Sequence, residues 1–171
     1  IFVNYSGSAV ALTPESERCE AILQAWYPGQ AGGTAVADVL FGDYNPAGRL
    51  PITFYKNTAQ LPDFEDYSMK GRTYRYFKDA PLFPFGYGLS YTTFAYGDAH
   101  IYRADNAKND MLLYIPVTNT GKREGEEVVQ VYLRKPGDTD APQRTLRGFK
   151  RVKLNAGQQQ EVCISLTDES F

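Results

Sequence analysis

The chain has 171 residues and a formal net charge of −2, with 43% hydrophobic and 22% charged residues. These values are typical of a globular protein with one ordinary domain or two small ones, and they give no electrostatic reason to expect a nucleic-acid partner. No apolar run approaches the roughly 20 residues of a transmembrane helix, and the first residues lack the pattern of a signal peptide, so we expect no membrane association.

The first 54 residues predict an α/β segment. Ile1–Tyr5 is a short apolar run, and it starts without Met, which favours a cut end. Thr13 and Pro14 are expected to be the N-cap and first position of a short helix. Ala21–Trp26 (AILQAW) is a second apolar run, and the crossover between the two runs is just long enough to join parallel strands.

A better-defined helix is predicted at Ala31–Phe41, because its apolar residues follow helical spacing and Gly42 stands where a terminating glycine is expected. Leu50–Phe54 reads as extended chain. A parallel sheet needs cover on both faces, and so few elements cannot supply it. We therefore expect residues 1–54 to be the edge of a larger domain.

Residues 55–91 are rich in Pro, Gly and aromatic residues and show little periodicity. The stretch is too long for an ordinary loop, and its many aromatic side chains argue against disorder. We interpret it as an ordered linker that packs against a neighbouring surface.

Residues 92–171 have the pattern of an antiparallel β-sandwich, with five expected strands. The first is expected at Phe94–Arg103. We expect a bulge or twist near Lys150 and Arg151, because the inward positions change parity there. An immunoglobulin-like sandwich has about seven strands, so this one is expected to be incomplete. The inward positions of the other four strands are expected to be Met111, Leu113, Ile115 and Val117; Val129, Val131 and Leu133; Phe149, Val152 and Leu154; and Val162, Ile164 and Leu166.

Cys19 and Cys163 are far apart in the sequence, and we interpret both as buried free thiols rather than a disulfide framework or metal site. His100 is the single histidine, so a catalytic triad or a histidine-based metal site would depend on it alone. No metal or organic cofactor is expected.

Several long motifs, in order, closely resemble those of glycoside hydrolase family 3. They are W-Y-P-G-Q-A-G-G (26–33), G-R-L-P-I-T-F (48–54), P-F-G-Y-G-L-S-Y-T-T-F (84–94), V-T-N-T-G (117–121), G-E-E-V-V-Q-V-Y (125–132) and L-R-G-F-K-R-V (146–152). The resemblance implies the end of the family's α/β sandwich domain, the linker, and a fibronectin type III-like domain. It also implies a parent enzyme that hydrolyses β-xylosides or β-glucosides with retention, and that is periplasmic or secreted.

In this family the nucleophilic Asp lies in an N-terminal barrel domain, and the acid/base Glu lies in the α/β domain upstream of Ile1. Neither can be assigned here, so the partners implied are the missing barrel and α/β domains, with a β-linked oligosaccharide bound through the parent. We predict that the isolated chain does not hydrolyse glycosides. The acidic cluster Asp63–Asp66 is interpreted as a solvated loop, Glu124, Glu126 and Glu127 as lining a sandwich edge, and Arg49 as either a buried ion-pair partner or an exposed charge.

Four residues are candidates for the rim of the parent's active site. Arg72 and Tyr74 belong to G-R-T-Y-R-Y-F (71–77), which resembles the form in the family's xylosidase and arabinosidase branch and in some glucosidases. Such side chains can stack on or hydrogen-bond to a sugar. Trp26 and Tyr27 follow a parallel strand, where ligands bind in open α/β sheets. The alternative is that these side chains pack the linker and the domains together.

A different class of function stays open. The β-sandwich could be an independent carbohydrate-binding or adhesion module that uses its tyrosines as a platform for sugars. Retention on a xylan or β-glucan column would separate this hypothesis from a bracing role.

Overall fold

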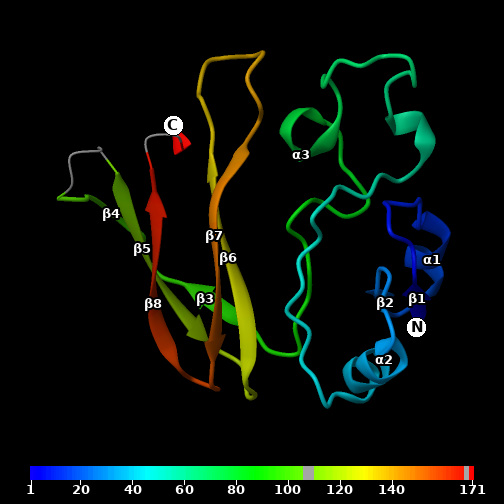
Figure 1. Cartoon of the computed structure of the whole chain (residues 1–171), viewed down its shortest axis with the longest axis horizontal. Coiled ribbons are helices and arrows are strands. Elements are labelled where there is room, and N and C mark those ends of the chain that lie inside the picture. Colours follow the sequence, from blue (N-terminus) through cyan, green and yellow to red (C-terminus); the bar gives the residue numbers. More distant parts are fainter. Residues whose placement is uncertain (106–109, 168–169) are drawn as a thin grey trace. The chain divides into compact units, whose positions relative to one another are not determined.

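The structure is a computed structural model that describes residues 1–105, 110–167 and 170–171 (Figure 1). It contains two compact units: residues 1–44 with 50–87, and residues 45–49 with 88–171. The first holds helices and a parallel strand pair, and the second is built from antiparallel strands. The α+β architecture expected from the sequence is confirmed.

The parallel strand pair of the first unit consists of β1 (Phe2–Asn4) and β2 (Ile22–Gln24), in the order expected. β2 is shorter than the predicted run because Trp26 has a φ of +56°, which no strand residue adopts. Helix α1 (Thr13–Arg18) links the strands. Thr13 lies inside this helix and is not its N-cap, because its hydroxyl donates to the carbonyl of Lys56 at 2.8 Å.

Helix α2 (Gly32–Phe41) ends at Gly42, as the sequence predicts. Gly42 has a φ of +86° and its N–H bonds the carbonyl of Val39 at 3.2 Å, which is the left-handed geometry that glycine supplies at a helix end. At the other end, a Cβ on Gly32 would lie 2.6 Å from the Pro28 ring, so this close approach also requires glycine.

The rest of the first unit is mostly irregular but ordered, with the short helices η1 (Thr58–Gln60) and α3 (Thr73–Tyr76). Backbone bonds join Leu50 to Tyr87 (2.8 Å) and Phe54 to Phe83 (2.9 Å), so two extended segments run antiparallel. Phe54, at one end of this ladder, is buried.

The second unit contains one sheet of four strands, in which β5 (Met111–Asn119) pairs with β8 (Gln159–Leu166) on one side. On the other side β5 pairs with β3 (Phe94–Tyr96) and β4 (His100–Arg103). The single strand expected at 94–103 is therefore two strands. Pro116 explains the break, because its carbonyl accepts a bond from Gly97 (2.8 Å) and it has no N–H to return one.

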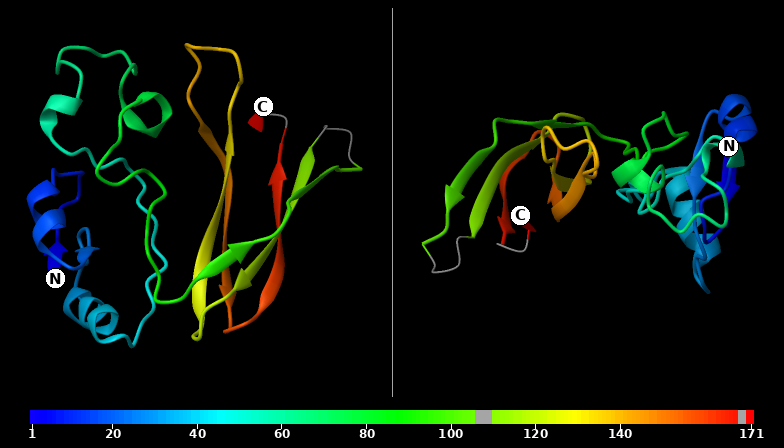
Figure 2. Two further views of the ribbon diagram at one scale, coloured as in Figure 1. Left: turned by 180° about the vertical axis from the view of Figure 1, so that it is seen from behind. Right: turned by 90° about the horizontal axis from the view of Figure 1, so that it is seen from above.

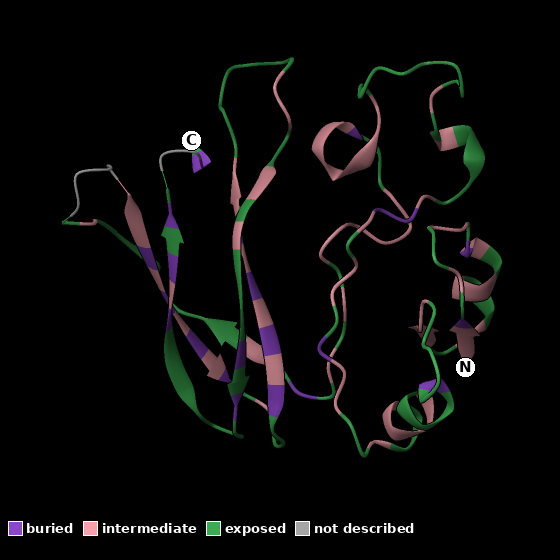
Figure 3. Cartoon of the chain, in the orientation of Figure 1, coloured by how far each residue is buried: buried purple, intermediate pink, exposed green. Residues whose placement is uncertain are grey.

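The other sheet pairs β6 (Gly125–Leu133) with β7 (Thr145–Leu154), and β7 contacts β8, as the views of Figure 2 show. Buried and part-buried residues alternate along β5 and β6 in Figure 3, which confirms the predicted periodicity. The core combines residues from both sheets: Leu113, Ile115, Val117, Val129, Val131, Val152, Leu154, Val162, Ile164 and Leu166.

Two expectations for β7 are wrong. Phe149 is 68% exposed and does not point inward, whereas Val152 and Leu154 are buried as predicted. Val131 pairs with Gly148 and Tyr132 with Leu146, so Arg147 is the extra residue and the bulge lies on β7 at Arg147, not at residues 150–151. With the irregularity placed there, Phe149 keeps the outward parity of the strand.

Both cysteines are free thiols, as expected. Each is partly exposed, however, so the expectation that they are buried is wrong. Cys163 lies on β8 next to two inward-facing neighbours, at the parity that points away from the core.

Candidate functional site

Two of the candidate rim residues, Trp26 and Tyr27, follow β2 in the first unit. The Trp26 ring meets Phe54 edge to face, with centroids 6.3 Å apart, so much of its surface is used in packing. Tyr27 is 81% exposed. The edge of its ring lies over Gly7, where an added Cβ would come within 2.2 Å of it.

The other two candidates, Arg72 and Tyr74, take part in internal contacts. Tyr74 stacks on Phe85, with ring centroids 4.1 Å apart and planes inclined by 19°. Arg72 Nη2 donates to the backbone carbonyls of Asp63 (2.8 Å) and Asp66 (2.9 Å), and so closes the acidic loop onto α3. The linker aromatics thus pack against one another within the first unit.

Backbone strain coincides with these candidates. Among the described residues, the non-glycine positions with positive φ are Trp26 (+56°) and Thr73 (+58°). Thr73 separates Arg72 from Tyr74 and is β-branched, which makes this conformation costly. Its N–H donates to the Tyr55 hydroxyl at 2.8 Å, one of the bonds that hold it there. Strain of this kind, of order 1–3 kcal/mol each, gathers at functional sites.

The acidic loop does not have the features of an acid/base pair. Its carboxylates are exposed, and the Asp66 side chain accepts the Ser68 N–H at 2.8 Å. Hydrogen bonds from Ser68 lower the pKa of Asp66, and the Arg72 charge adds to this effect. A general acid requires the opposite shift, so the interpretation as a solvated loop is supported.

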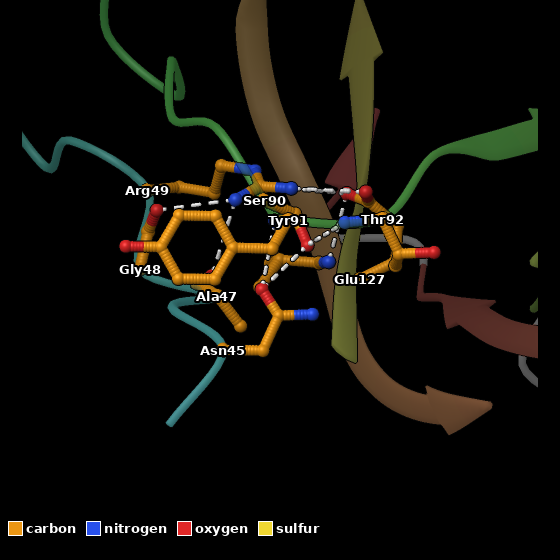
Figure 4. A network of polar contacts seen from close by, with 9 residues as sticks. Asn45, Ala47, Gly48, Arg49, Ser90, Tyr91, Thr92 and Glu127 are labelled. Atoms are coloured by element: carbon orange, nitrogen blue, oxygen red, sulfur yellow. Dashed lines mark hydrogen bonds and ion pairs between the residues drawn. The ribbon is translucent and has the colours of Figure 1, made fainter. Parts of the chain in front are cut away.

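The strongest polar cluster of the described residues lies in the second unit, around Arg49 and Glu127 (Figure 4). Arg49 Nη2 contacts both carboxylate oxygens of Glu127, at 3.0 and 2.9 Å, and the two side chains are only 12% and 11% exposed. Arg49 is therefore a buried ion-pair partner. Glu127 lies on β6, which pairs with β7 alone among the described strands, but its side chain is buried, while Glu124 and Glu126 form more exposed pairs with Lys153 and Arg151.

The sequence contained a signal for Glu127 that we did not use. Glu127, Val129 and Val131 stand at alternate positions, and all three face inward on β6. An acidic residue at inward parity requires a buried cation, because an unpaired charge there is very costly. The same alternation places Asn119 inward after Val117 on β5.

The described residues form no group of three or more His, Cys, Asp and Glu side chains that could hold a metal ion. His100, which the sequence left as the single possible triad or metal residue, lies exposed on β4. In the described part of the chain no helix has the length and apolar character that a membrane crossing needs.

Two family models match the chain. The glycosyl hydrolase family 3 C-terminal domain matches residues 1–91, and the fibronectin type III-like domain matches residues 127–171. Together they cover parts of both compact units.

The curated relatives that match the chain include proteins named as glycosidases. The chain is 62% identical to a xylan 1,4-beta-xylosidase of Xylanibacter ruminicola over 174 residues, which is 100% of this chain and 20% of that protein. It is 39% identical to a periplasmic beta-glucosidase of Salmonella typhimurium, again over 100% of this chain and 24% of the relative. The chain thus spans about a fifth to a quarter of the length of these relatives.

Solved structures agree in fold. The chain matches beta-glucosidase 3B of Thermotoga neapolitana with a TM-score of 0.88 and 33% identity, over 98% of this chain and 26% of that one. A beta-glucosidase of Streptomyces venezuelae, solved with D-glucose, matches with a TM-score of 0.84 and 35% identity, over 96% of this chain and 23% of that one.

Proposed function

Because the chain belongs to glycoside hydrolase family 3, we propose that it is the C-terminal structural portion of a retaining β-glycosidase that acts on β-xylosides or β-glucosides. The carrying observation is the alignment of the whole chain with only 20–24% of enzymes named as xylosidase or glucosidase. Its partners are the barrel and the remaining α/β portion of the same enzyme, and its substrate is a β-linked oligosaccharide bound with them.

We divide the chain by role. Residues 1–54 complete an α/β domain, residues 55–91 form the ordered linker, and residues 92–171 form the bracing sandwich, with which residues 45–49 pack. A two-stranded parallel pair supports the first assignment, because such a pair needs further strands and cover.

The chain itself is proposed to be inactive. A retaining glycosidase needs two carboxyl groups about 5–5.5 Å apart, one of them with a raised pKa. The most prominent carboxylates of the sandwich, Glu124, Glu126 and Glu127, are each ion-paired, and Asp66 is shifted toward its charged form. These groups stabilise structure and do not suit acid/base chemistry.

Within this proposal Tyr27 is the best candidate for direct contact with a sugar. It offers an exposed ring and a hydroxyl at the carboxyl end of a parallel strand. Only the edge of its ring lies against Gly7, whereas Trp26, Arg72 and Tyr74 make contacts within the first unit and serve as supports for the rim. The positive φ values at Trp26 and Thr73 favour a functional role for these segments.

We also propose a periplasmic or secreted enzyme. The support is the Salmonella typhimurium relative, which is named as periplasmic.

A chimera tests the proposal. This chain replaces the corresponding segment of the 62%-identical Xylanibacter ruminicola xylosidase, and hydrolysis of p-nitrophenyl β-D-xyloside and β-D-glucoside is measured. We expect turnover by the chimera, none by the isolated chain, and none by the relative with its segment deleted. Turnover by the isolated chain would refute the bracing role.

One observation favours a second function, a carbohydrate-binding sandwich. Tyr102 is 57% exposed on β4, and its ring meets Tyr114 of β5 edge to face at 5.7 Å. Such a pair is a possible platform for a sugar ring. Retention of the isolated chain on insoluble xylan, abolished by Tyr102→Ala, would support binding. Free passage through the column would argue against binding and leave bracing as the proposed role.

A further inference from the structure

The segment Asn45–Arg49 precedes the linker in sequence but belongs to the compact unit of the β-sandwich. It is held there by side chains at both of its ends, at Asn45 and at Arg49. The chain then leaves the sandwich unit for residues 50–87 and returns at Gly88. The segment is thus a five-residue piece of the sandwich unit inserted within the first unit.

At its N-terminal end, Asn45 uses both halves of its amide. Its Oδ1 accepts bonds from the Ser90 hydroxyl (3.0 Å) and the Tyr91 N–H (2.8 Å), and its Nδ2 donates to the carbonyl of Glu124 (3.0 Å). Gly125 leaves room for this amide, because a Cβ there would lie 2.8 Å from Asn45 Nδ2. Both the oxygen and the nitrogen of the Asn45 amide are therefore hydrogen-bonded to the sandwich unit.

At its C-terminal end, the guanidinium of Arg49 meets the inward-facing carboxylate of Glu127 with both oxygens in range. Arg49 Nη1 also donates to the carbonyls of Ala47 (3.3 Å) and Gly48 (3.1 Å), so the side chain folds over its own segment. The contact from Nη2 to both oxygens joins two opposite charges, and such charge-assisted hydrogen bonds are stronger than neutral ones.

The middle of the segment is also enclosed. Ala47 is buried, and the backbone of Gly48 is so close to Gly88 that an added Cβ would lie 2.2 Å from the Gly48 carbonyl oxygen. The segment is thus held by polar side chains at both ends, with a small buried residue between them (Figure 4).

We propose that the β-sandwich carries a peptide-binding site whose ligand is the chain's own segment Asn45–Arg49, anchored on the Glu127 carboxylate. In the chain, this docking fixes the points at which residues 50–87 leave and re-enter the sandwich unit. The inference does not depend on the proposed enzymatic function.

Trypsin tests it on the full chain, because the Arg49–Leu50 bond is a tryptic site whose side chain is sequestered while the segment is docked. We expect cleavage after Arg49 to be much slower than cleavage after the exposed Lys70 in the same molecule. Glu127→Gln removes the charge that holds Arg49, and we expect it to raise the rate of cleavage after Arg49 by about tenfold or more.

Glu126→Gln is the matched control, since Glu126 is the adjacent acidic residue on β6 and pairs with Arg151 at a more exposed position. It should leave cleavage after Arg49 unchanged. Equal effects of the two variants, or wild-type cleavage after Arg49 as fast as after Lys70, would overturn the proposal.

Cleavage after Lys153, within β7, reports global unfolding. If Glu127→Gln raises this cleavage in parallel, Asn45→Ala replaces it, because this variant removes the anchor at the other end and leaves the ion pair in place. Faster cleavage after Arg49 without a change after Lys153 supports the docked segment, and no change at either bond refutes it.

Discussion

The hydroxyl of Thr92 donates a 2.7 Å hydrogen bond to Oδ1 of Asn119, whose side chain is 0% exposed. The same oxygen accepts the N–H of Gly121, and the amide nitrogen donates to the carbonyls of Arg123 (2.8 Å) and Leu154 (3.0 Å). One buried amide thus ties the start of the sandwich, the end of β5 and the end of β7 together.

We expect Asn119→Asp to lower the free energy of unfolding by about 3 kcal/mol or more, because a carboxylate cannot donate to two carbonyls and is costly to bury. Thr92→Val should cost about 1 kcal/mol, since it removes one donor. Urea denaturation of the full chain followed by circular dichroism measures both. A loss below 1 kcal/mol for Asn119→Asp would contradict the assigned bonds.

Alanine substitutions at Gly33 and Gly42 should have opposite effects on the free energy of unfolding. Gly33→Ala should stabilise by about 0.5–1 kcal/mol, because it lies within α2 and nothing is within 4 Å of an added Cβ. Gly42→Ala should destabilise by about 1 kcal/mol, because its φ of +86° strains any residue with a Cβ. Thermal unfolding of the two variants checks the signs.

Substitutions at Leu154 and Phe149 test which residues of β7 face the core. Leu154→Ala should cost about 2–5 kcal/mol, because the side chain is fully buried in the core. Phe149→Ser should change stability by no more than about 0.5 kcal/mol, because the ring is exposed. A large loss for Phe149→Ser would restore the inward assignment that the sequence predicted.

Tyr96 is 52% exposed, and its partial desolvation, together with the charge and hydrogen bonding of Glu127, raises its pKa from 10.0 to about 12 against the opposing charge of Arg49. The folded state therefore keeps this proton at a pH where the unfolded chain loses it. The resulting stability is fully present below pH 10 and is lost as pH rises toward about 12.

We expect Tyr96→Phe to make the unfolding free energy less steep between pH 10 and 12. Glu127→Gln should lower the pKa of Tyr96 toward 10, as read from its ring carbon resonance by NMR, while Glu126→Gln should not. An unchanged pKa in Glu127→Gln would show that the carboxylate does not face the phenol.

Tyr27→Ala tests the rim in the xylosidase chimera. We expect KM to rise several-fold with unfolding unchanged, because the ring is exposed and supports little of the fold. Tyr74→Ala should instead lower stability by about 1 kcal/mol or more, because it removes the stack on Phe85. A KM unaffected by Tyr27→Ala would remove this residue from the proposed rim.

Local patterns predicted most of the fold. The alternation in β5, β6 and β8, the helix ending at Gly42, and the parallel order of β1 and β2 all follow from periodicity and glycine chemistry. The family resemblance added the order of the segments. The division of 94–103 into two strands was missed because its cause, Pro116, lies on the partner strand.

The polar cluster was the least predictable feature. Arg49 and Glu127 are 78 positions apart, and three glutamates of similar appearance stand together at the start of β6. Only the inward parity of Glu127 distinguishes it, and parity alone does not identify a partner so distant in sequence. The Phe149 error has a related cause: the bulge lies at Arg147 and not at residues 150–151, and misplacing it reverses the faces of the residues between the two positions, Phe149 among them.

The separation of Arg49 from Glu127 also sets an order of events on the ribosome. The acceptor is made 78 residues after the donor, which takes roughly 4–16 s at ordinary synthesis rates of about 5–20 residues per second. All of residues 50–87 are polymerised in that interval. In the nascent chain Arg49 therefore lacks its carboxylate partner until β6 emerges. Formation of the Arg49–Glu127 pair marks the point at which the sandwich has begun to assemble.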